Sequence, residues 1–343
     1  MTTLKDIAEQ AGVSIATVSY VLNGTRKVSD ATKQKILTIV EETGYQSNIL
    51  AKSLRSRKTG LIGVIVEDIQ AKHSPAIIDG INRAAEERGY QIILSNLRLI
   101  SKIGQEFSHI SKYRDDIERA LGTLNAIRAD GIIYVGMHDR KIPHFAEEKE
   151  IPFVYCYCYA ENGGSFVCYD DRKTSCELAR RLIEAGHRRF GILAGQVESE
   201  PSQRRLEGIT RALDEAGIPE SSRQIVYAGW KYETARNAAK KMLSEKTRPT
   251  AVMALNDEMA LGARDAAMQM RLSIPEDLSL TGFDNADEIQ YVVPHIATAS
   301  RPLSLMGERA VGILADQAEG RTNETINITL PCSIIEGESI GRI

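Results

Sequence analysis

The sequence predicts an all-α helix-turn-helix head followed by an α/β body of two doubly wound parallel-sheet lobes. Capping residues and a turn glycine mark out short helices before residue 45. After residue 60, short apolar runs alternate with amphipathic stretches of helical period, the pattern of parallel strands joined by covering helices. The expected domains are a head over residues 1–46, a hinge helix or linker over 47–59, and a body over 60–343.

The first helix begins after Thr3, whose hydroxyl can cap it, with Asp6 three residues later in the place of a capping-box acid. Apolar side chains recur on one face of this helix, at Leu4, Ile7, Ala8 and Ala11. Gly12 follows, where glycine accepts the positive φ that a sharp turn requires. A short capped helix followed by a glycine turn is the first half of a helix-turn-helix unit.

The second helix is the expected reading helix. Ser14 is a good N-cap, and Asn23-Gly24 is typical of a C-terminal cap. The apolar side faces inward, and the outward N-terminal face is the one that would meet base edges in the major groove. The DNA contacts expected from the head are Thr3, Ser14, Ile15, Ala16, Thr17, Ser19, Tyr20 and Asn23. A third helix is predicted from about Ser29 to Gly44.

Charge is distributed unevenly along the chain. Residues 1–60 carry nine Lys and Arg against five Asp and Glu, whereas the whole chain carries 43 against 46. No acidic residue lies between Glu42 and Glu67, so the hinge is locally cationic. A basic head on a weakly acidic body favours duplex DNA as a partner, because phosphates attract clustered Lys and Arg.

The apolar runs of the body predict two series of strands. The first series is LIGVIV, QIILS, GIIYV and FVYCY, and the second is FGILAG, IVYAG, AVMAL and LSLTGF. Helical patterns separate them, among them residues 75–88, 173–185 and 205–216. Lobes of this type bind ligands in the crevice at the carboxyl ends of their strands.

Several classes of protein are disfavoured. No apolar run is long enough for a transmembrane helix and the first residues lack a signal-peptide pattern, so we expect a cytoplasmic protein without membrane contact. The five cysteines have no CxxC spacing, which favours reduced, packed thiols over a metal site or disulfides. No metal-ligand, catalytic-triad or phosphate-loop motif occurs, so we expect no metal, no cofactor and no enzyme activity.

Together these segments resemble the lactose/galactose repressor family of bacterial transcription regulators, whose body is periplasmic-binding-protein-like. In the head, the likeness rests on LKDIAEQAGVSIATVSYVLNG, VSDATKQKILTIVEETGY and NILAKSLRSRKTGLIGVIV. In the body it rests on GHRRFGILAG, RRLEGI, RPTAVMALNDEMALGA, IPEDLSLTGFDN and RPLSLMGERAVGIL. These motifs extend over nearly the whole chain in the family's order.

The resemblance implies a hinge that becomes helical on operator DNA and enters the minor groove. Leu54 matches the family's wedge between base pairs, and a leucine among basic side chains suits that role; the alternative is that it packs on the body. The expected hinge contacts are Asn48, Ala51, Lys52, Leu54 and Arg55. Two positions depart from the family: Tyr20 replaces an arginine, which changes base preference, and Ser47 replaces a proline.

The resemblance also implies that the chain crosses three times between the lobes. The expected crossings lie near residues 158–164, 284–296 and 320–325. Lobe 1 would hold about 60–159 and 295–321, and lobe 2 about 160–290 and 322–343. A helix over residues 302–318 would return the chain to lobe 1.

The resemblance further places a small-molecule effector in the crevice between the lobes. Trp230, the only tryptophan, follows a strand, and an indole face packs well on a sugar or a purine ring. Asp284 and Asn256 also follow strands and offer acceptors and donors to hydroxyl or amine groups. The expected effector-binding residues are Glu67, Asp68, His73, Met137, Tyr157, Gln203, Trp230, Asn256, Asp284 and Arg301.

Three of these positions depart from the family's sugar-binding set. Gln203 replaces an arginine, Tyr157 an aspartate and Arg301 a glutamine. An arginine at 301 could hold a phosphate or a carboxylate, or it could pair with Asp284 or Glu67 and bind no ligand. Both alternatives are open, so a neutral sugar, a sugar phosphate and another acidic effector all fit the sequence.

Residues 97–128 form a longer segment than the family usually has between two strands. Its first part is polar, and an ordinary helix is predicted over 117–127. Two interpretations are open: an extended surface loop with its helix, or a device at the cleft rim or the dimer surface.

The leading hypothesis is a homodimeric repressor that binds a near-palindromic operator and is controlled by a small molecule, a sugar or sugar derivative. Control by a protein partner or a non-sugar co-repressor is the alternative. A solute-binding protein is a third candidate, which the basic head disfavours.

Overall fold

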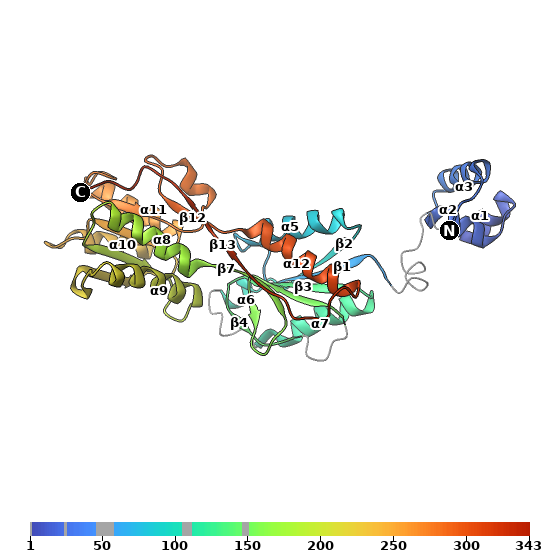
Figure 1. Cartoon of the computed structure of the whole chain (residues 1–343), viewed down its shortest axis with the longest axis horizontal. Coiled ribbons are helices and arrows are strands. Elements are labelled where there is room, and N and C mark those ends of the chain that lie inside the picture. Colours follow the sequence, from blue (N-terminus) through green and yellow to red (C-terminus); the bar gives the residue numbers. More distant parts are fainter. Residues whose placement is uncertain (1, 24–25, 46–57, 105–111, 146–150) are drawn as a thin grey trace. The chain divides into compact units, whose positions relative to one another are not determined.

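The computed structural model describes residues 2–23, 26–45, 58–104, 112–145 and 151–343. The chain divides into two compact units, Met1–Thr59 and Gly60–Ile343 (Figure 1). Among the described residues, no helix is long and apolar enough to cross a membrane.

The described part of the first unit packs α1 (Leu4–Ala11), α2 (Ile15–Asn23) and α3 (Asp30–Thr43) around a small apolar core. Thr3 and Asp6 form the predicted capping box: the Thr3 N–H donates to the Asp6 carboxylate at 2.7 Å, and the Asp6 N–H donates to Thr3 Oγ1 at 3.3 Å. Gly12 ends α1 with a φ of 68°. The buried core side chains are Ile7, Ala8, Ala11, Val18 and Ile36.

The first lobe of the second unit is built on a parallel sheet in the order β13-β7-β5-β3-β1-β2. Its strands are β1 (Leu61–Val66), β2 (Gln91–Asn96), β3 (Gly131–Val135), β5 (Phe153–Cys156), β7 (Ser165–Asp170) and β13 (Asn327–Pro331). Both faces of this sheet are covered by helices (Figure 1), which explains why β1 is buried along its whole length.

Alternate side chains of β1 face different helices. Ile62 and Val64 belong to the cluster that includes α5 (Ser74–Glu87) and α12 (Leu303–Ala318). Ile65 belongs to the cluster that includes α6 (Ile100–Ile103) and α7 (Arg114–Ala126). The sheet of this lobe is therefore the middle of three layers.

The second lobe repeats this plan on a parallel sheet in the order β11-β10-β8-β9. Its strands are β8 (Phe190–Ala194), β9 (Arg223–Tyr227), β10 (Ala251–Ala254) and β11 (Ser279–Thr281). Helices α8 (Asp171–Glu184) and α9 (Glu200–Glu215) pack on each other, as do α10 (Tyr232–Leu243) and α11 (Asp257–Gln269). All five cysteines of the chain carry free thiols, and four of them are buried.

Shorter elements complete the two lobes. They are β4 (Lys141–Ile142) paired with β6 (Tyr159–Ala160), β12 (Thr298–Ser300) paired with β14 (Ser333–Ile335), and the 3-10 turns η2 (Glu220–Ser222) and η3 (Asp287–Tyr291). Bridges from Thr281 to Ala297 and from Asp284 to Ser300 attach the segment around β12 to the second lobe.

The chain crosses between the lobes later than the resemblance to the family implies. Strands β7 and β13 belong to the first sheet, whereas both were expected in lobe 2. The crossings lie between β7 and α8, between β12 and α12, and between β13 and β14. The expected breaks near 158–164, 284–296 and 320–325 are therefore wrong.

Strands β7 and β13 lack the continuous apolar run from which the other eight strands of the two sheets were predicted. β13 is an edge strand of partly exposed residues that ends in Pro331, so it carries no continuous apolar run. β7 has polar residues at both ends, Ser165 and Asp170, which shortens its apolar part.

Candidate functional site

The head exposes the N-terminal half of α2, the expected reading face. Ser14 caps this helix, because the Thr17 N–H donates to Ser14 Oγ at 3.1 Å. The expected contacts Thr3, Ile15 and Ala16 are exposed, and Thr17, Ser19 and Tyr20 are partly exposed. Asn23 is the last residue of α2, in agreement with its expected place at the end of the helix.

Tyr20, which departs from the family's arginine, has a cationic neighbour. The Arg26 guanidinium lies 5.2 Å from the centre of the Tyr20 ring, within the range of a cation–π contact. The expected hinge contacts Asn48, Ala51, Lys52, Leu54 and Arg55, together with Ser47, lie outside the described residues.

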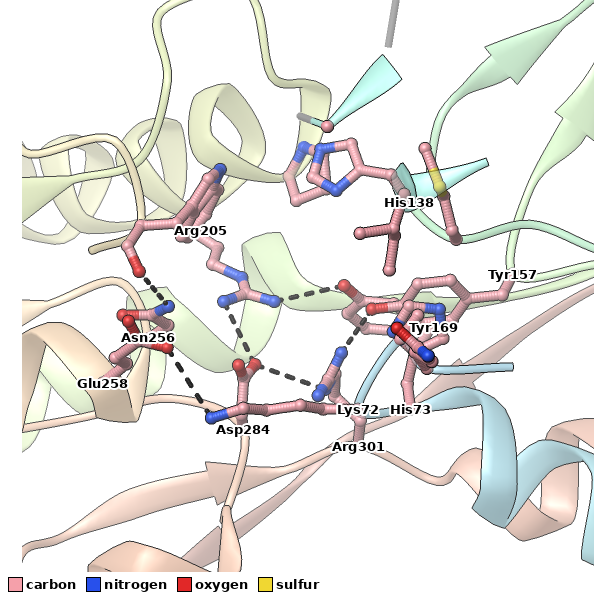
Figure 2. A pocket seen from close by; sticks show the side chains of 17 residues that line it. Lys72, His73, His138, Tyr157, Tyr169, Arg205, Asn256, Glu258, Asp284 and Arg301 are labelled. Atoms are coloured by element: carbon pink, nitrogen blue, oxygen red, sulfur yellow. Dashed lines mark hydrogen bonds and ion pairs between the residues drawn. The ribbon is translucent and has the colours of Figure 1, made fainter. Parts of the chain in front are cut away.

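A cavity of about 330 Å³ opens between the lobes of the second unit, at the ends of their strands (Figure 2). Its volume is sufficient for a compact small molecule. The lining residues are Gln70, Ala71, Lys72, His73, Ile100, Gly104, Met137, His138, Tyr157, Tyr169, Pro201, Arg205, Trp230, Asn256, Glu258, Asp284 and Arg301. Seven of the ten expected effector-binding residues are in this set: His73, Met137, Tyr157, Trp230, Asn256, Asp284 and Arg301.

Glu67, Asp68 and Gln203 do not line the cavity. Glu67 is fully buried, and Arg140 donates to both of its oxygens at 3.0 Å. The Tyr134 hydroxyl and the Met137 N–H each donate to it at 2.8 Å. With its acceptor positions occupied by protein groups, Glu67 joins β1 to the loop after β3 and faces no ligand space.

The Asp68 carboxylate also accepts hydrogen bonds from protein groups, in this case from backbone N–H groups. It accepts the Gln70 N–H at 2.9 Å and the Ile100 N–H at 2.8 Å, so it connects the loop after β1 with α6. Through this contact, Ile100 and Gly104 of the longer 97–128 segment are held at the cavity wall.

Gln203 lies on the exposed side of α9 and donates to the Val197 carbonyl at 2.9 Å. Arg205 occupies the cavity instead, two residues further along the helix. A signal for it existed in the sequence: Arg205 is four residues before Ile209 and seven before Ala212, both buried in α9. The helical period therefore puts Arg205, and not Gln203, on the inward face.

Arg205 is buried among aromatic rings. Its guanidinium lies 3.7 Å from the centre of the Phe283 ring and 5.6 Å from that of Trp230. It donates to the Leu255 carbonyl and, at 3.1 Å, to the Tyr169 hydroxyl. It also lies 3.4 Å from Asp284 Oδ1.

Arg301 approaches the same carboxylate from the segment between β12 and α12. Its Nε is 3.2 Å from Asp284 Oδ1, and its Nη1 donates to the Tyr157 hydroxyl. The Tyr157 ring stacks on His73 with 3.9 Å between ring centres. Arg301 thus pairs with Asp284, one of the two partners that the sequence allowed.

The two histidines of the cavity are uncharged near neutral pH. Burial and the nearby Arg301 lower the pKa of His73 to about 3, although its Nε2 bonds the Gly136 carbonyl at 3.1 Å. Burial also lowers the pKa of His138 well below its ordinary value, and neighbouring cations lower it further. His138 Nε2 lies 2.8 Å from Ser199 Oγ, and the two can hydrogen-bond.

Asn256 positions the tryptophan. Its Oδ1 accepts the Met259 N–H at 2.8 Å, which caps α11, and its Nδ2 donates to the Trp230 carbonyl at 3.2 Å. Tyr157, Trp230 and Asp284 have φ values of 60°, 70° and 123°, in the left-handed region that side chains rarely adopt. Such strained backbone is typical of ligand sites, and here three cavity residues share it.

The head and the body match known proteins separately. Residues 3–48 match the model of bacterial regulatory proteins of the lacI family, and residues 179–340 match a periplasmic binding protein-like domain. The chain is similar to the HTH-type transcriptional repressor PurR of Vibrio vulnificus, with 32% identity over 100% of both proteins.

Solved structures show the same fold over nearly the full length. The lac repressor dimer bound to operator and the anti-inducer ONPF has a TM-score of 0.80 at 24% identity and covers 99% of both chains. The complex of transcriptional regulator CelR with cellobiose has a TM-score of 0.64 at 27% identity and covers 99% of this chain and 100% of that one. The chain belongs to the lacI family of bacterial regulatory proteins and is a DNA-binding transcription regulator.

Proposed function

We propose that the protein is a homodimeric, cytoplasmic repressor whose cleft binds a sugar or sugar derivative and thereby changes its affinity for a near-palindromic operator. Repressors of this family bind operator DNA, dimerise and respond to small molecules. They are transcription regulators and not enzymes, and we infer no catalytic role for the cleft.

The observation that carries this proposal is the composition of the interlobe cavity. An indole, two tyrosine rings and two neutral histidines supply flat apolar walls, and Asp284 supplies a carboxylate at 23% exposure. A carboxylate can accept two adjacent hydroxyls while an aromatic face covers the C–H groups of the same ring. The cellobiose complex of CelR, a relative in fold, supports a sugar as the first ligand to test.

Control of DNA binding follows from the position of the cavity. A ligand that contacts both lobes can stabilise one arrangement of the lobes over another. It shifts DNA affinity only if these two arrangements differ in their affinity for the ligand and for DNA. Physics allows either sign, so a ligand that weakens operator binding is an inducer and one that strengthens it is a co-repressor.

The first test uses Trp230, the only tryptophan, as a reporter. Fluorescence of the full-length protein is followed while sugars, sugar phosphates and nucleobases are added separately. We expect a saturable change with one class, and the same compound should shift operator affinity in a parallel DNA-binding titration. Binding without any shift in operator affinity contradicts the proposed control.

A second measurement separates a regulator from a solute-binding protein. Affinity for operator duplex should fall steeply with salt concentration, because basic head residues displace counterions from phosphates. If ligand binds but duplex affinity is absent, the solute-binding alternative stands. If duplex affinity is normal but no small molecule binds, control by a protein partner replaces the proposal.

A further inference from the structure

Two guanidinium groups, those of Arg205 and Arg301, form one wall of the interlobe cavity (Figure 2). Their side chains are only 3% and 9% exposed, so solvent screens their charge poorly. A buried cation requires a compensating anion or an accessible ligand, since transfer out of water is unfavourable without one.

The cavity wall supplies one carboxylate to these two cations. Asp284 Oδ1 lies 3.4 Å from Arg205 and 3.2 Å from Arg301, and Figure 2 shows both guanidinium groups converging on it. The two arginines also donate hydrogen bonds to neutral oxygens, namely the hydroxyls of Tyr157 and Tyr169 and the Leu255 carbonyl.

Asp171, which does not line the cavity, is the next carboxylate in reach of Arg205. Its Oδ1 accepts from Arg204 at 2.9 Å, and its Oδ2, which accepts no hydrogen bond from the described residues, forms an ion pair with Arg205 Nε at 3.6 Å. Arg205 is therefore compensated in part from outside the cavity, whereas the carboxylate paired with Arg301 is Asp284 of the cavity wall.

The lowered pKa values of the two cavity histidines indicate the sign of the electrostatic potential at this wall. After burial, the charge that lowers the pKa of His73 is that of Arg301. The charges that lower the pKa of His138 include those of Arg140 and Arg205. Both rings thus experience a net cationic surrounding.

The charges at the mouth of the cavity do not alter this balance. Lys72 lies 3.6 Å from Glu258 and 3.2 Å from Glu288, and all three side chains are at least 42% exposed. Exposed pairs of this kind are screened by water and salt, so they contribute little to the potential inside.

We propose that the effector carries an oxyanion, a carboxylate or a phosphate, and that Arg301 together with Arg205 binds it. This inference rests on the proposed function, since it assumes that the cavity is the effector site. A planar guanidinium binds an oxyanion through two parallel N–H···O bonds. The anion would exchange the neutral Tyr157 acceptor of Arg301 for a charged one, and the second guanidinium would no longer share a single carboxylate.

The test compares matched neutral and acidic ligands on the full-length protein by Trp230 fluorescence and by calorimetry. The probes are glucose, gluconate and glucose 6-phosphate, then uracil and its 6-carboxyl derivative, and finally inorganic phosphate alone. We expect an acidic member to bind at least about tenfold more tightly than its neutral counterpart, as a charged hydrogen bond implies. The carboxylate and phosphate members distinguish the two sources of the oxyanion.

Variants assign the preference to Arg301. Arg301→Gln should bring the ratio of acidic to neutral affinity close to one, whatever its effect on the neutral member, whereas Arg301→Lys should keep part of the preference. Arg83→Gln is the matched control, because Arg83 pairs with Glu308 outside the cavity. Thermal unfolding of each variant checks that the fold is retained, and the lysine variant preserves the test if the glutamine variant is unstable.

The outcomes separate this inference from the proposed function. Tight binding of a neutral ligand with no preference for its acidic counterpart overturns the oxyanion and leaves the effector site standing. An acidic preference that survives in Arg301→Gln overturns the role of Arg301. If no compound binds while operator affinity is normal, both proposals fail.

Discussion

At the residue scale, two acidic side chains that follow strands differ in whether their carboxylate is available to a ligand. Glu67 follows β1 and Asp284 follows β11, and both were expected at the effector. Glu67 is enclosed by donors from Arg140, Tyr134 and Met137, whereas Asp284 faces the cavity. The partners of Glu67 lie 67 to 73 residues away, so no local pattern reveals that its oxygens are occupied.

Glu67→Gln should destabilise the body, because it leaves the Arg140 guanidinium, 8% exposed, without its carboxylate. Breaking a buried pair on one side costs about 3–5 kcal/mol, so we expect a loss of that order in urea unfolding. Glu308→Gln, which breaks the more exposed pair with Arg83, is the control and should cost less than about 1 kcal/mol. Equal effects of the two substitutions contradict the structural role of Glu67.

Arg205 shows the opposite situation, in which a local pattern was sufficient. Its place in the cavity follows from helical period once α9 is known to begin at Glu200. Ser199 caps the helix through the Ser202 N–H, and Pro201 occupies its first turn, both ordinary start signals. The predicted helix began at residue 205, so Gln203 was left outside it and its exposed orientation was not recognised.

At the element scale, the contact between α5 and α12 depends on two glycines. A Cβ at Gly80 would lie 2.0 Å from the Ser304 carbonyl oxygen, and one at Gly307 would lie 2.3 Å from the Ile77 carbonyl oxygen. The two helix backbones therefore approach as closely as they do only because neither position has a side chain. This contact holds the returning helix on the first lobe.

Gly80→Ala should separate α5 from α12 and destabilise the body by about 1–3 kcal/mol, the usual cost of overpacking. Gly122 provides the matched control, since it lies in α7 with open space around an added Cβ. Gly122→Ala should stabilise by up to about 1 kcal/mol through helix propensity. Calorimetric unfolding of both variants checks the sign, and stabilisation by Gly80→Ala would refute the close contact.

At the scale of the whole second unit, polar contacts join the lobes beside the cavity. Asp139, from the loop after β3, accepts from Arg204 of α9 at 2.5 Å. The Lys141 N–H donates to Glu200 at 2.8 Å, and the Tyr159 hydroxyl donates to the same carboxylate. The start of α9 is thus attached to the first lobe, so a change of lobe angle must rearrange these bonds.

One of these contacts should depend on pH. Burial raises the pKa of Asp139 from its ordinary 3.8 to about 6, against the opposing effect of Arg204. The folded state then binds this proton more tightly than the unfolded chain, so ionisation lowers stability as pH rises from 4 to 6. Relative to Asp139→Asn, the wild type should lose about 2 kcal/mol between pH 4.5 and pH 7.5 in urea unfolding. A difference between the two proteins that stays constant over this range refutes the shift.

The sequence by itself determined the local architecture. The capping box at Thr3 and Asp6, the Gly12 turn, and the eight strands with strong apolar runs were all predicted, because caps and periodicity act within a few residues. The family follows from the same local motifs. Seven cavity residues were also predicted, since each lies near a strand end and the carboxyl ends of parallel strands meet at one edge.

The tertiary structure alone decided which polar groups remain available. Strands β7 and β13 were assigned to the first lobe only by their pairing, because strands with a weak apolar pattern derive their order from neighbours distant in sequence. Glu67 and Asp68 bind other protein groups and therefore do not belong to the candidate site. Arg301 pairs with Asp284, which the sequence allowed but did not decide. Hydrogen bonding and charge compensation are satisfied across the folded chain, so a sequence shows which groups are present but not which are already paired.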